Sequence, residues 1–268
     1  MKRKFTEIED NLFKTLHKKG NPLVLYNIWD VGSAQIVEKS GAKALATSSW
    51  AVAKSYGYED GEKFPLKLAL QNLKNIIEKV KVPVSFDFES GFASKLSDLI
   101  ENVEHVIKTG AIGINFEDQI IGKEKARYSI EEQCKRIKAI KAIKEAIKEL
   151  LPNMFINART DIFLQKDTSE HNEQDLKEAI ERSKAYAEVG ADGFFAPGLA
   201  NHNFIKQLCE FSPIPVNIMV QDITTVKNLV DLGVSRISYG PFPYIAVMQE
   251  LDKSATEVLT YIDTNKKT

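Results

Sequence analysis

The sequence predicts a (β/α)₈ TIM barrel, and three observations carry this prediction. Short runs rich in β-branched and aromatic residues alternate with long helical patterns, which gives about eight strand and helix units. Glycine recurs where a helix should end and the next strand should begin. These glycines are Gly41, Gly110, Gly190 and Gly233. The chain of 268 residues is long enough for such a barrel, so we expect a single domain over residues 1–268.

The expected strands are short and evenly spread. They lie near residues 22–26, 43–47, 82–88, 111–117, 153–159, 191–196, 214–219 and 234–239. Alternation of strands with helices implies a parallel sheet. An open doubly wound sheet would need a glycine-rich phosphate loop after its first strand, and residues 25–30 contain no glycine. A closed barrel is therefore favoured.

The helices should form the outer ring of the barrel. The helix expected near residues 130–150 is amphipathic, with Ile137, Ile140 and Ile143 on one side and lysines between them. An extra helix near residues 5–19 precedes the first strand. A helix that follows Pro243 completes or extends the ring.

The composition argues against several classes of partner. A formal net charge of -1 gives no basic field for nucleic acid. No apolar run approaches the roughly 18 residues that cross a bilayer, and the acidic stretch 6–10 does not suit a leader sequence. Cys134 and Cys209 lie in expected helices, so no disulfide framework or zinc cluster is indicated. We expect a cytoplasmic protein that binds a small molecule, with no nucleic-acid or membrane partner.

Charged residues recur where three of the strands end. The third strand runs into Asp87 and Glu89, the fourth into Glu117 and the fifth into Arg159. A buried carboxylate costs several kcal/mol unless a cation or hydrogen bonds compensate it, so packing alone does not explain this pattern. The carboxyl ends of barrel strands converge on one mouth. Because Mg²⁺ binds carboxylates, water and substrate oxygens, the three acids are predicted metal ligands.

Other polar residues are expected at the same mouth. Arg159 has a planar donor fork that can grip a carboxylate or phosphate, although it could instead neutralise the neighbouring acids as a structural ion pair. The histidines fall away from strand ends, which disfavours zinc and non-haem iron. Further residues expected at strand ends are Thr47, Ser48, Ser49, Asp118, Asn157, Asp161, Asn217 and Gln221. Trp29 and Trp50 either line the pocket or serve packing.

These motifs together resemble those of the isocitrate lyase and phosphoenolpyruvate mutase superfamily. Residues 87–92, Asp-Phe-Glu-Ser-Gly-Phe, are similar to its acidic metal motif, usually two aspartates before a glycine turn. Residues 27–34, 117–119 and 158–161 match its other signatures in the same order, and the resemblance covers roughly residues 20–245. It implies a Mg²⁺ cofactor and an enzyme that makes or breaks a C–C or C–P bond of a 2-oxo acid or phosphoenolpyruvate-type substrate, through an enolate that the metal stabilises.

The resemblance also implies roles for single residues. Asp87 matches the direct Mg²⁺ ligand, while Glu89 and Glu117 match acids that reach the metal largely through water; Glu89 replaces the usual aspartate. Asp60 matches an acid near the metal, and Lys123 a lysine of the mobile loop. The implied substrate-binding residues are Asn27, Ser48, Ser49, Trp50, Arg159 and Asn217.

Residues 120–128 should form a lid or an ordinary solvated loop, and they bear on the branch of the superfamily. The lyases of the family carry a cysteine in a Lys-Arg-Cys-Gly-His type motif there, and this chain has no cysteine in that segment. The mutases have an asparagine where this chain has Lys125, and a histidine where it has Pro197. Neither branch fits, so lyase and mutase both stay open.

Two further alternatives come from other classes. A Schiff-base aldolase would need a lysine at a strand end, whereas Lys123 is in a loop. A barrel that binds a 2-oxo acid without catalysis is motivated by the missing loop acid.

The last helix bears on assembly. In the family it is often exchanged between subunits, which implies a homodimer or homotetramer. Its apolar residues include Ile245, Val247, Met248 and Leu251. A helix packed on its own barrel would show the same periodicity.

Overall fold

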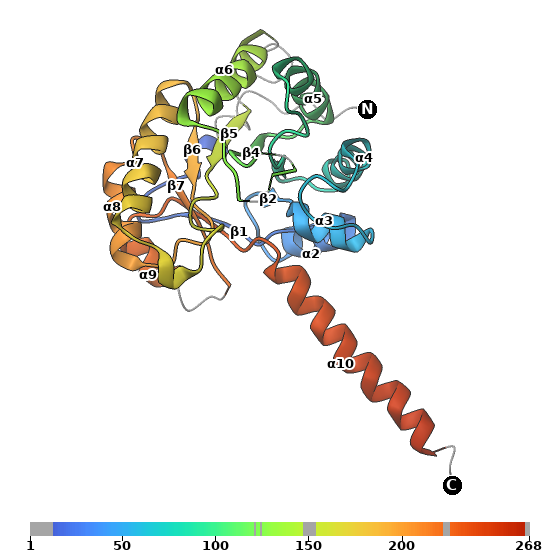
Figure 1. The fold of residues 1–268 in the computed structure, drawn as a ribbon. Helices are drawn as coiled ribbons and strands as arrows, with labels where there is room; N and C mark the ends of the chain where they lie inside the picture. Colours follow the sequence, from blue (N-terminus) through green and yellow to red (C-terminus); the bar gives the residue numbers. More distant parts are fainter. Residues whose placement is uncertain (1–12, 121, 124, 147–153, 222–225, 266–268) are drawn as a thin grey trace.

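Eight parallel strands form a nearly closed barrel with helices around it (Figure 1). The computed structural model describes residues 13–120, 122–123, 125–146, 154–221 and 226–265. The strands are β1 (Leu23–Leu25), β2 (Leu45–Ala46), β3 (Val84–Asp87), β4 (Gly113–Glu117), β5 (Phe155–Arg159), β6 (Gly193–Phe195), β7 (Val216–Met219) and β8 (Arg236–Ser238). Each lies within the range that the sequence predicts, so the barrel is confirmed.

The strand order shows where the ladder of the barrel is interrupted. Ladders join the strands in the order β1, β8, β7, β6, β5, β4, β3, β2. Between β1 and β2 the structure has only an isolated parallel bridge, from Ile28 to Thr47, just beyond the ends of both strands. In the described part of the chain, β1 and β2 are therefore joined at the mouth end of the barrel.

Helices follow the strands as the pattern predicts. They are α2 (Val31–Lys39), α3 (Ser49–Ser55), α4 (Leu66–Ile77), α5 (Leu96–Thr109), α6 (Ile130–Ala146), α7 (Glu173–Glu188), α8 (His202–Phe211), α9 (Val226–Asp231) and α10 (Phe242–Asn265), with a 3₁₀ turn η1 (Thr168–Glu170). The expected continuation of α6 to residue 150 lies outside the described residues. At the end of α5, Gly110 has a φ of 92°, a left-handed conformation that favours glycine, as the sequence predicts.

The segment before β1 plugs the bottom of the barrel. Phe13 meets the ring of Phe155 edge-on, and His17 stacks on the same ring with 4.2 Å between centroids. Burial, assisted by the nearby charge of Arg236, lowers the pKa of His17 to about 3, so this histidine is neutral. Residues 13–15 are helical, and residues 5–12 of the expected extra helix lie outside the described residues. The extra segment thus seals the end of the barrel opposite the mouth.

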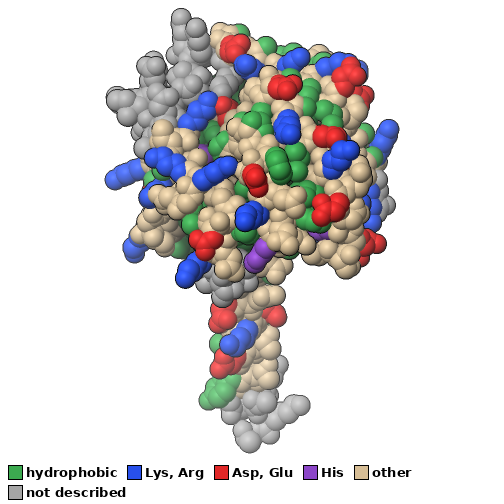
Figure 2. Space-filling model, turned by 90° about the vertical axis from the view of Figure 1, so that its left-hand side faces the viewer, with side chains coloured by type: hydrophobic (Ala, Val, Ile, Leu, Met, Phe, Trp, Pro, Cys, Tyr) green, Lys and Arg blue, Asp and Glu red, His purple; other side chains and the backbone are tan. Residues whose placement is uncertain are grey.

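The last helix, α10, projects away from the barrel instead of packing along it (Figure 1). Figure 2 shows it extending below a barrel face on which basic and acidic side chains are interspersed. None of the helices in the described part of the chain has the length and apolar character to span a membrane.

Candidate active site

The carboxyl ends of β3, β4 and β5 bring the predicted charged residues together. These strands are neighbours in the sheet, and their registers pair Asp87 with Asn115 and Glu117 with Arg159. Because alternate residues of a strand face the same side, Asp87 and Glu117 both point into the barrel end. All of these side chains are buried or nearly so.

Asp87 is held from several directions. Its Oδ2 accepts a hydrogen bond from the backbone N–H of Ser49 at 3.0 Å, and its Oδ1 faces the side-chain amide of Asn115 at 3.4 Å. Its own N–H donates to Oγ1 of Thr47. The carboxylate that the sequence predicts as the direct metal ligand is therefore fixed in place by β2, α3 and β4.

Glu89 lies in a tight turn that hydrogen bonds with Glu62 hold in place. Glu89 and Phe92 have positive φ values of 48° and 52°, which side chains other than glycine rarely adopt. Glu62, from the loop before α4, accepts hydrogen bonds from the N–H groups of Ser90 and Phe92 and from the Ser90 hydroxyl. In return its N–H donates to Oε2 of Glu89 at 2.7 Å. The sequence analysis missed Glu62, because nothing in its local pattern marks a residue that acts across 28 positions.

Arg159 lies between two acids. Its Nη1 is 2.9 Å from Oε2 of Glu117, and its Nε and Nη2 donate to Asp161 at 2.6 and 2.9 Å. Burial opposes the charge of the guanidinium, but the two carboxylates outweigh burial and hold its pKa well above the usual value. The predicted structural ion pairs are therefore present, and the side chain is still 14% exposed at the mouth.

Negative charge is in excess at this mouth. Burial is the main cause of the raised pKa of Glu89, with Asp60, Asp87 and Glu62 adding to it. Burial likewise raises the pKa of Glu117 despite Arg159. Asp60 also has a raised pKa, from burial and from Asp87, and its carboxyl bonds the side chain of Ser49. Burial is thus the largest cause of each raised pKa, and neighbouring carboxylates add to it.

The acids do not form a closed metal cage. Within the part of the chain that the structure describes, no three His, Cys, Asp or Glu side chains are arranged to bind a metal together. The metal-ligand roles of Asp87, Glu89 and Glu117 stay predictions. A small cavity lies beside Asp87 and Glu89, lined also by Ser49 and Phe92.

Several residues predicted to bind substrate have structural partners. The Asn27 side-chain amide donates to the carbonyl of Thr47, and its oxygen accepts from the N–H groups of Tyr239 and Gly240, so it ties three loops together. The hydroxyl of Ser48 caps α3 by accepting from Ala51 N–H.

Trp50 and Asn217 also contact other residues of the protein. The ring of Trp50 lies 6.0 Å from that of Tyr244 at the start of α10, in a cluster with Trp29. Asn217 is fully buried in the barrel, and its oxygen accepts from the Ser238 hydroxyl. Their predicted contact with substrate stays a prediction.

Asp118 departs from the expectation that both acids after β4 face the mouth. Its carboxylate is completely buried and accepts hydrogen bonds from Arg182 and from the hydroxyl of Tyr186, both on α7. It also accepts from the N–H of Asp161. Adjacent residues of a strand point to opposite sides, so Asp118 supports the wall while Glu117 faces the mouth.

Lys123 is exposed in the loop after β4. Residues 121 and 124 of this loop lie outside the described part. An isolated antiparallel bridge between Gln119 and Arg127 joins the two ends of the loop. The structure thus places Lys123 on the loop that follows the strand of Glu117, and its predicted catalytic role stays a prediction.

Comparison with known proteins finds matches that cover most of the chain. A family model described as phosphoenolpyruvate phosphomutase matches residues 13–259. The chain is 32% identical over 234 residues to an uncharacterized protein of Mycobacterium tuberculosis, which covers 87% of this chain and 83% of that protein. It is 26% identical over 255 residues to the 2-methylisocitrate lyase of Escherichia coli, covering 92% and 81%.

A solved structure shares the fold over nearly the whole chain. It comes from a Burkholderia cenocepacia protein that is assigned, but not established, as a phosphonomutase. The TM-score is 0.87 and the sequences are 38% identical, with 93% of this chain and 98% of that chain covered.

Proposed function

Because the chain belongs to the phosphoenolpyruvate phosphomutase family, we propose that it is a Mg²⁺-dependent cytoplasmic enzyme that acts on a 2-oxo acid or phosphoenolpyruvate-type substrate. The reaction would make or break a C–C or C–P bond next to an enolate. One observation carries this proposal: the buried carboxylates of Asp87, Glu89 and Glu117 converge with Arg159 at the mouth of the barrel. A divalent cation and an anionic substrate would balance these charges.

The residues present suit a hard cation. Asp87 would bind Mg²⁺ directly, and Glu89 and Glu117 would hold its water ligands. When bound, the ion would supply the positive charge that stabilises negative charge developing on the substrate oxygen beside the carboxylate.

Side chains of the protein would bind the substrate, hold or release a proton and supply further positive charge. Arg159, braced by Glu117 and Asp161, would present its exposed edge to the anionic group of the substrate. Asp60, whose pKa is raised by burial and by Asp87, would hold or release a proton at its carboxyl group. Lys123 would contribute a positive charge from its loop.

Metal removal tests this proposal. Purified protein would be assayed for product formation with oxaloacetate, phosphonopyruvate, methylisocitrate and related acids, in Mg²⁺ and in EDTA. We expect turnover of at least one of them to fall by about a hundredfold or more in EDTA and to return with Mg²⁺, because the metal would supply several kcal/mol of transition-state stabilisation. Undiminished turnover in EDTA would contradict the proposal.

The same assay separates the alternatives. Binding of Mg²⁺ and oxalate without turnover of any substrate would favour a non-catalytic 2-oxo-acid-binding barrel, and an adduct trapped by borohydride would favour a Schiff-base aldolase. Interconversion of phosphoenolpyruvate and phosphonopyruvate, followed by ³¹P NMR, would identify a phosphonomutase-type isomerase. Pro197, where the mutases have histidine, and the loop without cysteine leave lyase and mutase equally open.

We also propose that the protein is a homodimer or homotetramer, with α10 as the exchanged element. This helix projects from the barrel (Figure 1). Apolar side chains along its length are exposed. They are Val247, Met248, Leu251, Val258, Leu259 and Tyr261. Burial of such a row by a second copy would stabilise the assembly through the hydrophobic effect.

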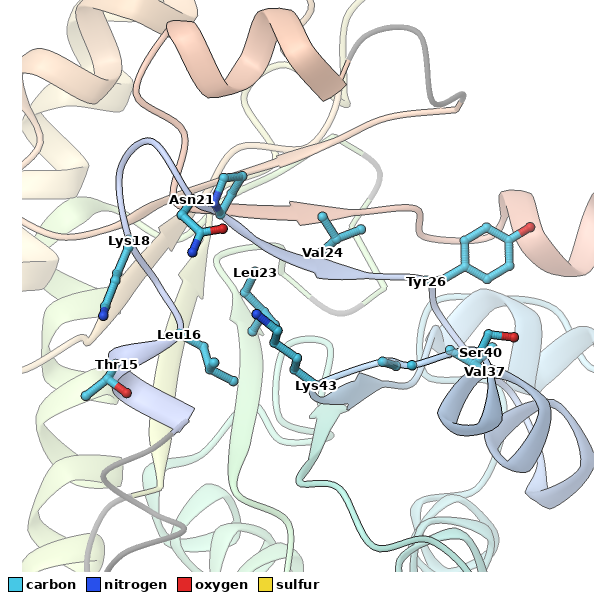
Figure 3. Close-up of a pocket in the computed structure, with 13 residues that line it drawn as sticks. Thr15, Leu16, Lys18, Asn21, Leu23, Val24, Tyr26, Val37, Ser40 and Lys43 are labelled. Carbon is cyan, nitrogen blue, oxygen red and sulfur yellow. The ribbon is translucent and has the colours of Figure 1, made fainter.

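A pocket on the outside of the barrel supports this proposal. A pocket of about 570 Å³ lies on the outer side of β1, between the segment 15–18 and the end of α2 (Figure 3). Val24 and Tyr26 of this region are 41% and 45% exposed. In a (β/α)₈ barrel, helices normally cover the outer faces of the strands. The α10 helix of the same chain turns away from the outer face of β1 (Figure 1). We propose that α10 of a second copy covers it.

Disrupting the apolar row should separate the subunits. Light scattering after gel filtration should give a dimer or tetramer for the wild type and a monomer for Val247→Asp combined with Leu251→Asp, because two carboxylates would have to be buried. Gln249→Asp, on the opposite side of α10, is the control and should leave the mass unchanged. A monomeric wild type at micromolar concentration would refute the assembly.

A further inference from the structure

A buried arginine lies inside the barrel, below the acids of the mouth. Arg236 is on β8, is 1% exposed, and has Leu23 and Asn217 as its register neighbours on β1 and β7. Among the described residues no carboxylate forms an ion pair with it, and its Nε and Nη1 have no hydrogen-bond acceptor. A buried cation without a paired anion is costly, so its presence calls for an explanation.

Among the described residues, the Arg236 guanidinium donates one hydrogen bond, and it leads toward Asp87. Its Nη2 donates to Oδ1 of Asn115 at 3.1 Å. The same oxygen accepts from Nδ2 of Asn157 at 2.9 Å. Two donors therefore converge on one side of the Asn115 amide, and they fix which end is oxygen and which is nitrogen.

The fixed amide then faces Asp87. Its Nδ2 is 3.4 Å from Oδ1 of Asp87, and a rotated amide would instead place oxygen against oxygen there. Asp87 is also the acid whose charge acts on Arg236 across this gap. Together the three residues form a polar chain from β8 through β4 to β3.

We infer that Arg236 is a positioning residue for the metal site: through Asn115 it orients and electrostatically supports the carboxylate of Asp87 from inside the barrel. The inference rests on the proposed function, since it assigns Asp87 the role of metal ligand. A carboxylate that is already held needs less reorganisation when the cation binds, and partners of this kind commonly affect metal affinity by 10- to 100-fold.

Metal affinity tests the inference without relying on turnover. Calorimetric titration of Mg²⁺ in the presence of oxalate should show about tenfold weaker binding for Arg236→Met, because the variant loses the charge and the donor while keeping the length. Arg236→Lys, which keeps a charge and a donor, should recover part of this loss. Asn115→Ser should weaken binding as much as Arg236→Met, and the double variant should be no worse than either, because both changes interrupt one chain.

A purely structural role for Arg236 predicts a different result. Leu23→Ala, which alters the neighbouring interior position on β1, is the matched control and should lower the unfolding midpoint without changing Mg²⁺ affinity. Wild-type affinity in both Arg236→Met and Asn115→Ser would overturn the inference while leaving the proposed function intact. If Arg236→Met fails to fold, Asn115→Ser and Arg236→Lys decide the question. No Mg²⁺ binding in the wild type would overturn both proposals.

Discussion

Replacement of Asp87 by alanine should abolish Mg²⁺-dependent binding of oxalate, with a loss in affinity of at least about a hundredfold. The reason is that Asp87 is the acid proposed to bind the ion directly, and its two oxygens are already aimed by Ser49 and Asn115. The fold should persist, because the substitution also removes one of several carboxylates that repel each other at the mouth. Calorimetry with Mg²⁺ and oxalate, together with a thermal melt, measures both effects.

A matched variant separates this result from a general effect of charge. Asp98→Ala removes the same charge from α5, where Asp98 is exposed and accepts a hydrogen bond from the hydroxyl of Ser97. It should bind Mg²⁺ and oxalate like the wild type. Wild-type binding by Asp87→Ala itself would show that the metal site is elsewhere.

Replacement of Asp118 by alanine should lower the free energy of unfolding by about 3–5 kcal/mol. Asp118 is completely buried and pairs with Arg182 at 3.1 Å. Without the Asp118 carboxylate, the buried positive charge of Arg182 would lose a paired anion. The hydroxyl of Tyr186 would also lose a hydrogen-bond acceptor. Urea denaturation followed by circular dichroism gives the change.

A surface ion pair provides the control for this prediction. Glu131 and Lys135 are closer, at 2.7 Å, but both side chains are largely exposed. Glu131→Ala should therefore change the unfolding midpoint far less than Asp118→Ala, because water screens the exposed pair. Equal effects of the two substitutions would mean that burial does not determine how much the Asp118–Arg182 ion pair contributes to stability.

The fold was open to prediction because its signals are local. Strand runs, helical periodicity and the glycine stops repeat along the chain, and each is set by residues close in sequence. Gly110 illustrates this, since the end of α5 and the left-handed φ both follow from one residue. The interrupted ladder between β1 and β2 was not predicted, because the local pattern of a strand does not show how its edge pairs with a distant strand.

The site was predicted in part for the same reason. Asp87, Glu117 and Arg159 stand at strand ends, and parallel strands deliver such residues to one mouth. Glu62 and Arg236 gave no comparable signal. A charged residue on a short strand, such as Arg236, could have been noticed, but its partner lies 121 residues away.

The sequence by itself determined that eight strand and helix units form a barrel and that acids and an arginine meet at its mouth, because strand period and chain direction fix which residues share an end. The tertiary structure alone decided what each charge meets there. Glu117 faces Arg159, while its neighbour Asp118 turns to Arg182 on α7. The physical reason is that a strand sets only the side to which a residue points, whereas its partner and its burial come from elements distant in the chain.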